Sequence, residues 1–369
     1  MKTFWESVTE GIEIQDLWAQ FRAEARASYG FYVKDVDQDW VKGESRFKRR
    51  IRIWRLFFWA VLMKLSPSRR LLLLIAVVLF VLALAGVWPL GWPLTVVALF
   101  LLLILELADR VAMKRDLEIA REIQGWLVPK EAPQIAGVDI AFATRPQNTV
   151  AGDYYDAFLR PAANGAAPGP AGPSPTADNR LLLVVADVAG KSVPAALLMA
   201  TFQASLRTLA AAPVTFFDLV NRLNGYACAH SLGGLRFTTA FFAELEPTSR
   251  ALTYINAGHN PPILRRASGE IERLEAGGLP LGIKSDVRYD SDTVALRAGD
   301  LLAVFTDGVV EAENENGEEY GESRLLALLT TASAGAAQEQ LKRLMASVDA
   351  FVGPARQHDD ITCLLLRSL

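Results

Sequence analysis

Aspartates occur at four places in the chain where an apolar segment meets a turn. They lie in the segments AGDYYD (151–156), ADVAG (186–190), TDG (306–308) and HDD (358–360). In two of these places, LLLVVAD and LLAVFTD, a strand-like apolar run ends on the acid. A carboxylate at the end of a buried strand is costly to ionise unless it is paired or binds a cation. The four segments are therefore the strongest candidates for a catalytic or metal-binding site.

Convergence of these acids would create a site for divalent cations. Carboxylates close together in a low dielectric repel one another, and a divalent cation removes that repulsion. Ligands that are all oxygen favour Mg²⁺ or Mn²⁺ over zinc. A single strand-end Asp-Gly is usually only a turn, but four such acids in one region favour a metal centre.

Other catalytic machinery is scarce in the sequence. It contains no Gly-x-Ser-x-Gly elbow, no P-loop and no Cys-Arg phosphatase spacing. The histidines His230, His259 and His358 form no HExxH motif, and Cys228 and Cys363 suggest neither a disulfide framework nor a metal knuckle. A water activated by two metal ions is the best nucleophile that the sequence offers.

Strands and helices arrive in separate groups after residue 130. Strands are expected at 137–143, 181–186, 236–245, 251–256, 300–305 and 361–367, and helices at 194–211, 215–231, 322–332 and 336–351. This grouping predicts an α+β layered fold rather than a βαβ repeat. Ser192 is a candidate helix cap, and Thr215 and Asp218 have capping-box spacing. The Pro/Gly/Ala-rich stretch 161–179 is expected to be a flexible insertion between two strands.

Residues 71–105 contain no charged side chain. As one helix, these residues would extend about 52 Å, well beyond a bilayer core of about 30 Å. The segment WPLGWP (88–93) breaks the run and predicts two transmembrane helices within 71–108, over 71–88 and 93–108. Basic residues on both sides place both flanks in the cytoplasm. A buried hairpin in a soluble protein is the alternative.

The remaining segments complete a four-part organisation: an N-terminal cytoplasmic region 1–70, the spans 71–108, a linker helix 109–129 and a domain 130–369. The helical pattern 107–127 is expected to carry a signal from the membrane and to form a homodimer with its copy, or else to pack on its own domain. Residues 56–63 suit either a membrane interface or a packed helix. The one basic block, 42–70, adjoins the apolar run, which argues against nucleic-acid binding.

Short motifs in the domain resemble a known family in their order along the chain. They are EIQ (122–124), LVP (127–129), AGDYYD (151–156), DVAGKSVPAALLMA (187–200), NAGHNPP (256–262), LPLGI (279–283), TDGVVEAEN (306–314), YG (320–321) and DDIT (359–362). Together they resemble the stage II sporulation E branch of the PPM (type 2C) metal-dependent serine/threonine phosphatases. The resemblance implies an αββα four-layer sandwich, with two mixed sheets face to face, helices outside and the metals at one edge.

The resemblance also implies roles for individual residues. Metal ligation and catalysis are carried over to Asp153, Asp187, Asp307 and Asp359, and further ligation to the carbonyl of Val188 and to Asp360. Asp156 would hold an outer-sphere water or cap the next strand. Gly152 would allow close approach of the backbone to the metal or form a bulge. His259 would serve a structural hydrogen bond or act as a general acid.

The function implied by the resemblance is that of a protein phosphatase with two Mn²⁺ or Mg²⁺ ions and no phosphoenzyme. Its substrate would be a phosphoserine or phosphothreonine protein of the anti-anti-sigma type, in bacterial partner-switching signalling. It would be a multi-pass protein of the bacterial inner membrane with its catalytic domain in the cytoplasm. Two alternatives are a catalytically silent membrane signalling scaffold and a two-metal nucleotide hydrolase or cyclase, the latter weakened by the missing phosphate-binding glycine loop.

Overall fold

The structure, a computed structural model, describes most of the chain after residue 64. The described residues are 55, 59, 62, 63, 65–162, 179–231, 236–331 and 335–369. They belong to two compact units, Met1–Met113 and Lys114–Leu369. Most of the predicted N-terminal region and of the 161–179 insertion lies outside the described residues.

Two helices form a hairpin in the first unit, α4 (Pro67–Leu84) and the first part of α5 (Gly91–Leu127). The predicted break at 88–93 is shifted, because Trp92 and Pro93 already lie in the first turn of α5. Proline is tolerated there, since its missing N–H has no helical partner to lose. The second predicted span and the linker helix are one continuous helix of 37 residues, about 55 Å long.

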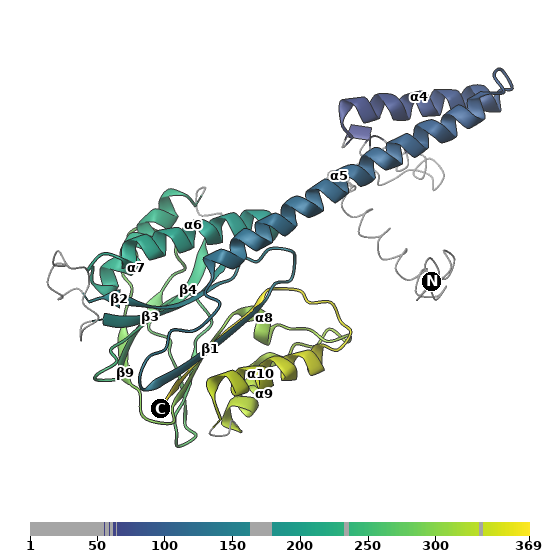
Figure 1. Ribbon diagram of the computed structural model, residues 1–369. Helices are drawn as coiled ribbons and strands as arrows, with labels where there is room; N and C mark the ends of the chain where they lie inside the picture. Colours follow the sequence, from purple (N-terminus) through teal and green to yellow (C-terminus); the bar gives the residue numbers. More distant parts are fainter. Residues whose placement is uncertain are drawn as a thin grey trace, which may run out of the picture. The chain divides into compact units, whose positions relative to one another are not determined.

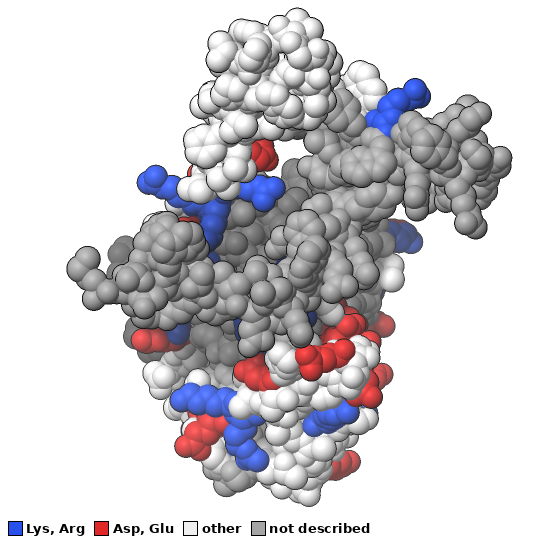
Figure 2. Space-filling view, turned by 90° about the vertical axis from the view of Figure 1, so that its right-hand side faces the viewer, with Lys and Arg blue, Asp and Glu red and all other residues white. Residues whose placement is uncertain are grey.

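The two helices of the hairpin pack closely and keep most of their apolar side chains exposed. A Cβ on Gly91 would lie 2.7 Å from the carbonyl oxygen of Leu79, so only glycine permits this approach. Arg69 pairs with Glu106 at 3.2 Å and with Asp109 at 2.6 Å. Figure 2 shows the tip of the hairpin free of charged side chains. Both helices are long and apolar enough to cross a membrane.

Two β-sheets form the centre of the second unit (Figure 1). The first sheet has the order β1 (Val138–Arg145), β11 (Ile361–Ser368), β10 (Leu301–Phe305), β6 (Ile263–Arg265), β7 (Ile271–Arg273). The second has the order β2 (Tyr154–Pro161), β3 (Asn179–Val188), β4 (Thr238–Leu245), β5 (Ala251–Ala257), β8 (Gly277–Gly278), and β9 (Asp292–Ala295) also pairs with β5. Only the β5–β8 pairing is parallel among these strands, so the expectation of two mixed sheets is wrong for the first sheet.

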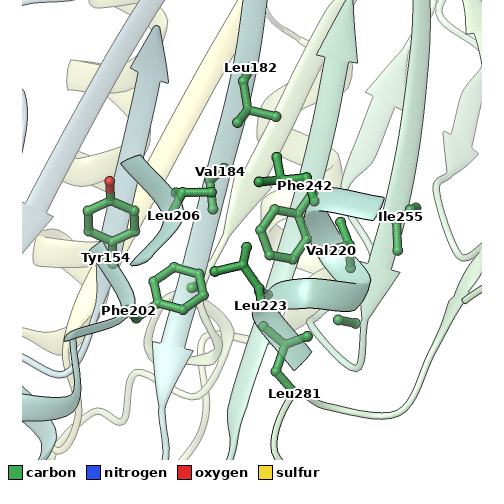
Figure 3. Close-up of a cluster of buried hydrophobic side chains, with 14 of the residues drawn as sticks. Tyr154, Leu182, Val184, Phe202, Leu206, Val220, Leu223, Phe242, Ile255 and Leu281 are labelled. Carbon is green, nitrogen blue, oxygen red and sulfur yellow. The ribbon is translucent and has the colours of Figure 1, made fainter. Parts of the chain in front are cut away.

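Helices cover the outer face of each sheet. Besides the end of α5, the described helices of the second unit are α6 (Ser192–Ala210), α7 (Phe216–Ala229), α8 (Asp307–Val310), α9 (Gly321–Thr330) and α10 (Ala337–Val352). Helices α6 and α7 bury their apolar faces against the second sheet, as Figure 3 shows, and α8 to α10 bury theirs against the first. A third cluster fills the space between the sheets. The layers are helix, sheet, sheet, helix, so the predicted αββα sandwich is confirmed.

Strand β3 shows why its sequence is apolar on both faces. Leu182 and Val184 point to the helix layer, where Figure 3 shows them in one cluster with Leu206 of α6. Leu181 and Leu183 point to the other sheet. Successive residues of a strand alternate between faces, so a central strand of a four-layer sandwich needs a continuous apolar run.

The caps of α6 and α7 differ from each other. The Thr215 hydroxyl accepts a hydrogen bond from the Asp218 N–H at 3.0 Å, as the capping-box spacing predicts. Ser192 is not the cap of α6, because Lys191 occupies the N-cap position. Ser192 itself has φ 62°, in the left-handed region that side chains with a Cβ rarely adopt.

The predicted insertion joins two strands that are paired up to its edges. Pro161 lies opposite Asn179 in the β2–β3 register. We expect replacement of residues 162–178 by a four-residue turn to leave turnover unchanged and to stabilise the protein by about 1 kcal/mol, because a shorter loop costs less closure entropy. Chemical denaturation and a turnover assay check this. A large loss of activity or solubility would contradict the interpretation of this stretch as an insertion.

Candidate active site

The register of the second sheet brings two of the predicted acids to one edge. Tyr154, the first residue of β2, lies opposite Ala186 of β3. Asp153 immediately precedes β2, and Asp187 immediately follows Ala186 in β3. Because the strands are antiparallel, the two acids are neighbours across the strand pair. Asp153 is buried and Asp187 is partly buried.

The first sheet places the other acids at its own end in the same way. Phe305, the last residue of β10, lies opposite Cys363 of β11. Asp307 follows β10 by two residues and begins α8, while Asp359 and Asp360 directly precede β11. These acids therefore also gather where β10 ends and β11 begins.

Hydrogen bonds join the two sheet edges into one site. The Thr306 hydroxyl donates to Asp153 Oδ2 at 2.9 Å, which links the first sheet to the second. The N–H groups of Gln147 and Gly152 donate to the two carboxylate oxygens of Asp360, each at 2.6 Å. Asp360 thus holds the loop that carries Asp153. The sequence did not indicate either the Thr306 contact or this use of Asp360.

The loop before Asp153 is held from two further sides. A Cβ on Gly152 would lie 3.2 Å from the Val188 carbonyl oxygen and 3.7 Å from Asp187 Oδ1, so the glycine permits close approach of the two acid-bearing loops. The Gln124 side chain of α5 pairs with the backbone of Ala151, donating to its carbonyl at 2.7 Å and accepting from its N–H at 3.0 Å. The side chains of Gln124 and Asp360 therefore hold the backbone of the two residues that precede Asp153.

The acids act on one another electrostatically. Burial, and then the charges of Asp307, Asp359 and Asp360, raise the pKa of Asp187 to about 7. Burial, and then the charge of Asp187, holds the pKa of Asp153 well above its usual range. Burial also raises the pKa of Asp307 and of Asp360, with Asp359 adding to both shifts. The cluster is short of positive charge, which is the condition under which a cation binds.

The chemistry of this donor set fits Mg²⁺ or Mn²⁺. The converging groups are carboxylate and carbonyl oxygens, the ligands that these hard cations prefer. Among the described residues, no three His, Cys, Asp or Glu side chains form a group that could already hold a metal ion.

A lysine that sequence reasoning did not single out lies at this cluster. Lys191 Nζ donates to Asp359 Oδ2 at 2.9 Å and to the carbonyl oxygen of His358 at 2.7 Å. Its charge lowers the pKa of Asp187 and of Asp307, against the burial and the neighbouring acids that raise them. No sequence spacing signals this contact, because the partners are far apart along the chain.

Asp156 has neither of the roles expected for it. It is fully buried within β2 and accepts hydrogen bonds from Arg207 of α6, from Nε at 2.7 Å and from Nη2 at 2.8 Å. The Tyr154 hydroxyl donates to the same carboxylate. The Arg207 guanidinium also lies 3.8 Å from the centre of the Phe158 ring. Asp156 therefore anchors α6 to the sheet, and both the outer-sphere and the strand-cap expectations are wrong.

This ion pair should matter for stability and not for chemistry. We expect Arg207→Met to destabilise the fold by about 3 kcal/mol, because it leaves the buried Asp156 carboxylate without its counter-charge. Asp156→Asn should cost about 1–2 kcal/mol, since the half-exposed Arg207 can turn to water. Denaturation of both variants and of the double variant measures these costs, and turnover per folded molecule should be unchanged. Equal losses of unfolding free energy in the two single variants would contradict the prediction that an unpaired Asp156 costs more than an unpaired Arg207.

His259 lies in the loop between the two sheets and is buried. The backbone N–H of His259 donates to Asn256 Oδ1 at 2.7 Å, and its ring Nδ1 lies 3.2 Å from the Thr239 hydroxyl oxygen. Burial lowers its pKa to about 4, so the ring is neutral near pH 7. A neutral, buried ring is poorly suited to act as a general acid, and the geometry favours the structural interpretation.

A four-layer αββα sandwich with a cluster of carboxylates at one edge defines a PP2C-type (PPM) serine/threonine phosphatase domain. Residues 177–368 match the sequence profile of the family described as Stage II sporulation protein E (SpoIIE). The match spans more than half of the chain, and the chain belongs to this family. The predicted family and enzyme class are thereby confirmed.

Individual relatives have low sequence identity. The chain is 28% identical over 256 residues to phosphoserine phosphatase RsbU of Bacillus subtilis, covering 69% of this chain and 70% of that protein. It is 27% identical over 275 residues to protein IcfG of Synechocystis, covering 68% of this chain but only 41% of IcfG. In structure, it is similar to the SiaA-PP2C domain of Pseudomonas aeruginosa, with TM-score 0.57, 22% identity, and coverage of 70% of this chain and 98% of that domain.

Proposed function

We propose that this protein is a membrane-anchored, metal-dependent phosphatase that removes phosphate from phosphoserine or phosphothreonine in a regulatory protein. The observation that carries the proposal is the meeting of acids from both sheets at one edge. There, burial and mutual repulsion raise the pKa of Asp187 to about 7. A site this short of positive charge is suited to divalent cations and to the phosphoryl group that they bind.

The proposed ligands are the predicted ones. Asp153, Asp187, Asp307 and Asp359, with Asp360 and the carbonyl of Val188, would hold two Mn²⁺ or Mg²⁺ ions. When bound, the ions supply a water of lowered pKa and neutralise charge on the phosphoryl oxygens. The protein's own part is positioning: Thr306 orients Asp153, and Asp360 holds the loop before it. Water and the phosphomonoester give the free hydroxyl and inorganic phosphate, without a phosphoenzyme.

The proposed substrate is a phosphorylated protein of the anti-anti-sigma type, in bacterial partner-switching signalling. The support is the set of relatives, since RsbU and RsbP of Bacillus subtilis are named phosphoserine phosphatases. The chain spans less than half of the length of IcfG and of RsbP. The substrates and partners of those whole proteins are therefore proposals for this chain.

Turnover by the purified full-length protein tests the activity. We expect release of inorganic phosphate from a phosphoserine peptide with Mn²⁺ or Mg²⁺, abolished by a chelator and restored by the metal. No phosphate should remain covalently bound to the protein during turnover. A folded protein that binds the metal and the phosphopeptide but releases no phosphate would instead support the signalling-scaffold alternative.

The membrane anchor is proposed from the hairpin. Its two apolar helices keep most of their side chains exposed, a surface suited to lipid. Basic residues at both ends favour cytoplasmic flanks and a multi-pass protein of the bacterial inner membrane, with the parts 1–70, 71–108, 109–129 and 130–369.

Reporter fusions check this topology. We expect fusions at Lys42 and at Lys130 both to report a cytoplasmic position, because positively charged flanks are retained on that side. A periplasmic signal at either residue would exclude the two-span arrangement. Cofractionation with soluble protein would exclude the anchor itself.

A homodimer through the linker helix is the remaining proposal. Ile119, Ile123 and Trp126 of α5 are exposed at helical spacing, which suits pairing with a second copy. Insertion of one to four residues after Asp116 would rotate the domain relative to the spans. Activity that is indifferent to every insertion length would argue against coupling through this helix.

A further inference from the structure

Lys191 is held in an unusual backbone setting at the start of α6. The residues on either side of it both have left-handed backbone angles, Gly190 with φ 118° and Ser192 with φ 62°. The second is a strained conformation for serine, and such strain persists only where the surrounding structure imposes it. The turn directs Lys191 across the sandwich edge, from the end of β3 to the loop before β11.

The contact made by Lys191 occupies the carboxylate of Asp359, which is one of the proposed metal ligands. Asp359 Oδ1 accepts the N–H of Asp360 at 2.8 Å, and Asp359 Oδ2 accepts the Lys191 ammonium at 2.9 Å. Both oxygens of this proposed ligand are therefore engaged. A divalent cation at Oδ2 would lie close to the ammonium, and the two positive charges would repel each other.

The Lys191 side chain is also able to dissociate from Asp359. Its side chain is 55% exposed and that of Asp359 is 42% exposed, so the ion pair is a weak one at the surface. The ammonium is on a flexible stem with several rotatable bonds, and it can turn from Asp359 toward solvent.

We propose that Lys191 is an exchangeable counter-ion of the active site: it pairs with Asp359 when no metal is bound, gives up this carboxylate to the metal, and then binds the phosphoryl group of the substrate. This inference rests on the proposed metal-dependent phosphatase function. Lys191 then competes with the metal for the Asp359 carboxylate and strengthens binding of the phosphoryl group.

The alternative is a static clamp that joins the start of α6 to the β11 loop. The two interpretations predict opposite changes in metal affinity when the Lys191 ammonium is removed. Loss of a clamp would loosen Asp359 and weaken binding of both metal and phosphate. Loss of a competing cation would strengthen metal binding while weakening phosphate binding.

Calorimetric titrations of the full-length protein distinguish them. For Lys191→Met, which keeps the length of the side chain and removes its charge, we expect Mn²⁺ to bind about two- to fivefold more tightly. Inorganic phosphate, titrated at saturating Mn²⁺, should bind about three- to tenfold more weakly. Lys191→Arg should retain phosphate binding closer to wild type. The matched control is Lys284→Met, which removes an exposed lysine paired with Asp286 at 3.4 Å and should change neither affinity.

The outcomes separate the inference from the function on which it rests. Unchanged or weakened Mn²⁺ affinity in Lys191→Met, with normal binding by the wild type, would overturn the counter-ion role and leave the phosphatase proposal intact. Absence of Mn²⁺ and Mg²⁺ binding by the wild type would overturn both. Opposite shifts of the two affinities in Lys191→Met, absent from Lys284→Met, would establish the exchange.

Discussion

Asp307→Asn is expected to abolish phosphatase turnover while leaving the fold intact. The substitution keeps the shape of the side chain and removes the negative charge of a proposed ligand. Loss of groups that merely support a metal ligand typically costs 10–100-fold, so loss of the ligand itself should lower turnover by at least about 100-fold. The variant should also lose most of the thermal stabilisation that Mn²⁺ gives the wild type, about 2.7 kcal/mol at one hundred times the dissociation constant.

The metal-free variant should be at least as stable as the metal-free wild type. Burial and Asp359 raise the pKa of Asp307 in the fold, so its ionised form costs stability at neutral pH. That cost disappears as the pH falls through the raised pKa toward the unfolded value near 4. The melting temperature of the metal-free wild type should therefore gain more than that of the variant between pH 8 and pH 5.

Thermal melts with and without Mn²⁺, together with phosphopeptide turnover, test both expectations. The exposed Asp286→Asn is the matched control, since it removes one negative charge away from the cluster. Turnover and metal response equal to wild type in Asp307→Asn would remove Asp307 from the site. Lower stability with normal turnover would assign it a structural role.

The layers and the acid cluster could be predicted because their signals are local. Apolar runs ending on Asp187 and just before Asp307 mark central strands whose ends carry charge. The short strands β6 to β9 and the helix α8 could not be predicted, because two to four residues carry too little periodicity. Their positions are decided by pairing with neighbours that the sequence does not identify.

The contacts around the acids could not be predicted for a different reason. Asp156 lies in the same motif as Asp153, yet its side chain points to α6 and pairs with Arg207, 51 residues away. Lys191 reaches Asp359 across 168 residues. Residue type and local spacing locate an acid, but long-range packing selects its partner.

Gly308 shows how the physical reason for a residue can differ from the one its sequence suggests. In the motif TDG, a glycine after the acid is typical of a tight turn. In the structure, Gly308 lies inside α8 and is buried. A Cβ on it would lie 1.9 Å from the backbone carbonyl oxygen of Asp360, far inside van der Waals contact. The glycine is thus required by the close passage of the loop that carries Asp359 and Asp360.

Gly308→Ala is therefore expected to damage both the fold and the site. The backbone before β11 would have to move by about 1 Å or more, and a displacement of this size at a reacting centre can lower turnover about 100-fold. Overpacking of a buried position should also cost about 1–3 kcal/mol. Because the moving segment includes a proposed ligand, metal affinity should fall together with stability.

Gly225→Ala is the matched control for this prediction. Gly225 is exposed in the interior of α7, and a Cβ added to it would meet nothing within 4 Å. Alanine is the better helix former there by up to about 1 kcal/mol, so this variant should be more stable with unchanged turnover. Denaturation, Mn²⁺ titration and turnover on both variants separate a general effect of alanine from a local one. Wild-type metal affinity in Gly308→Ala would mean that the β11 loop yields without disturbing the acids, and the steric explanation of the motif would fail.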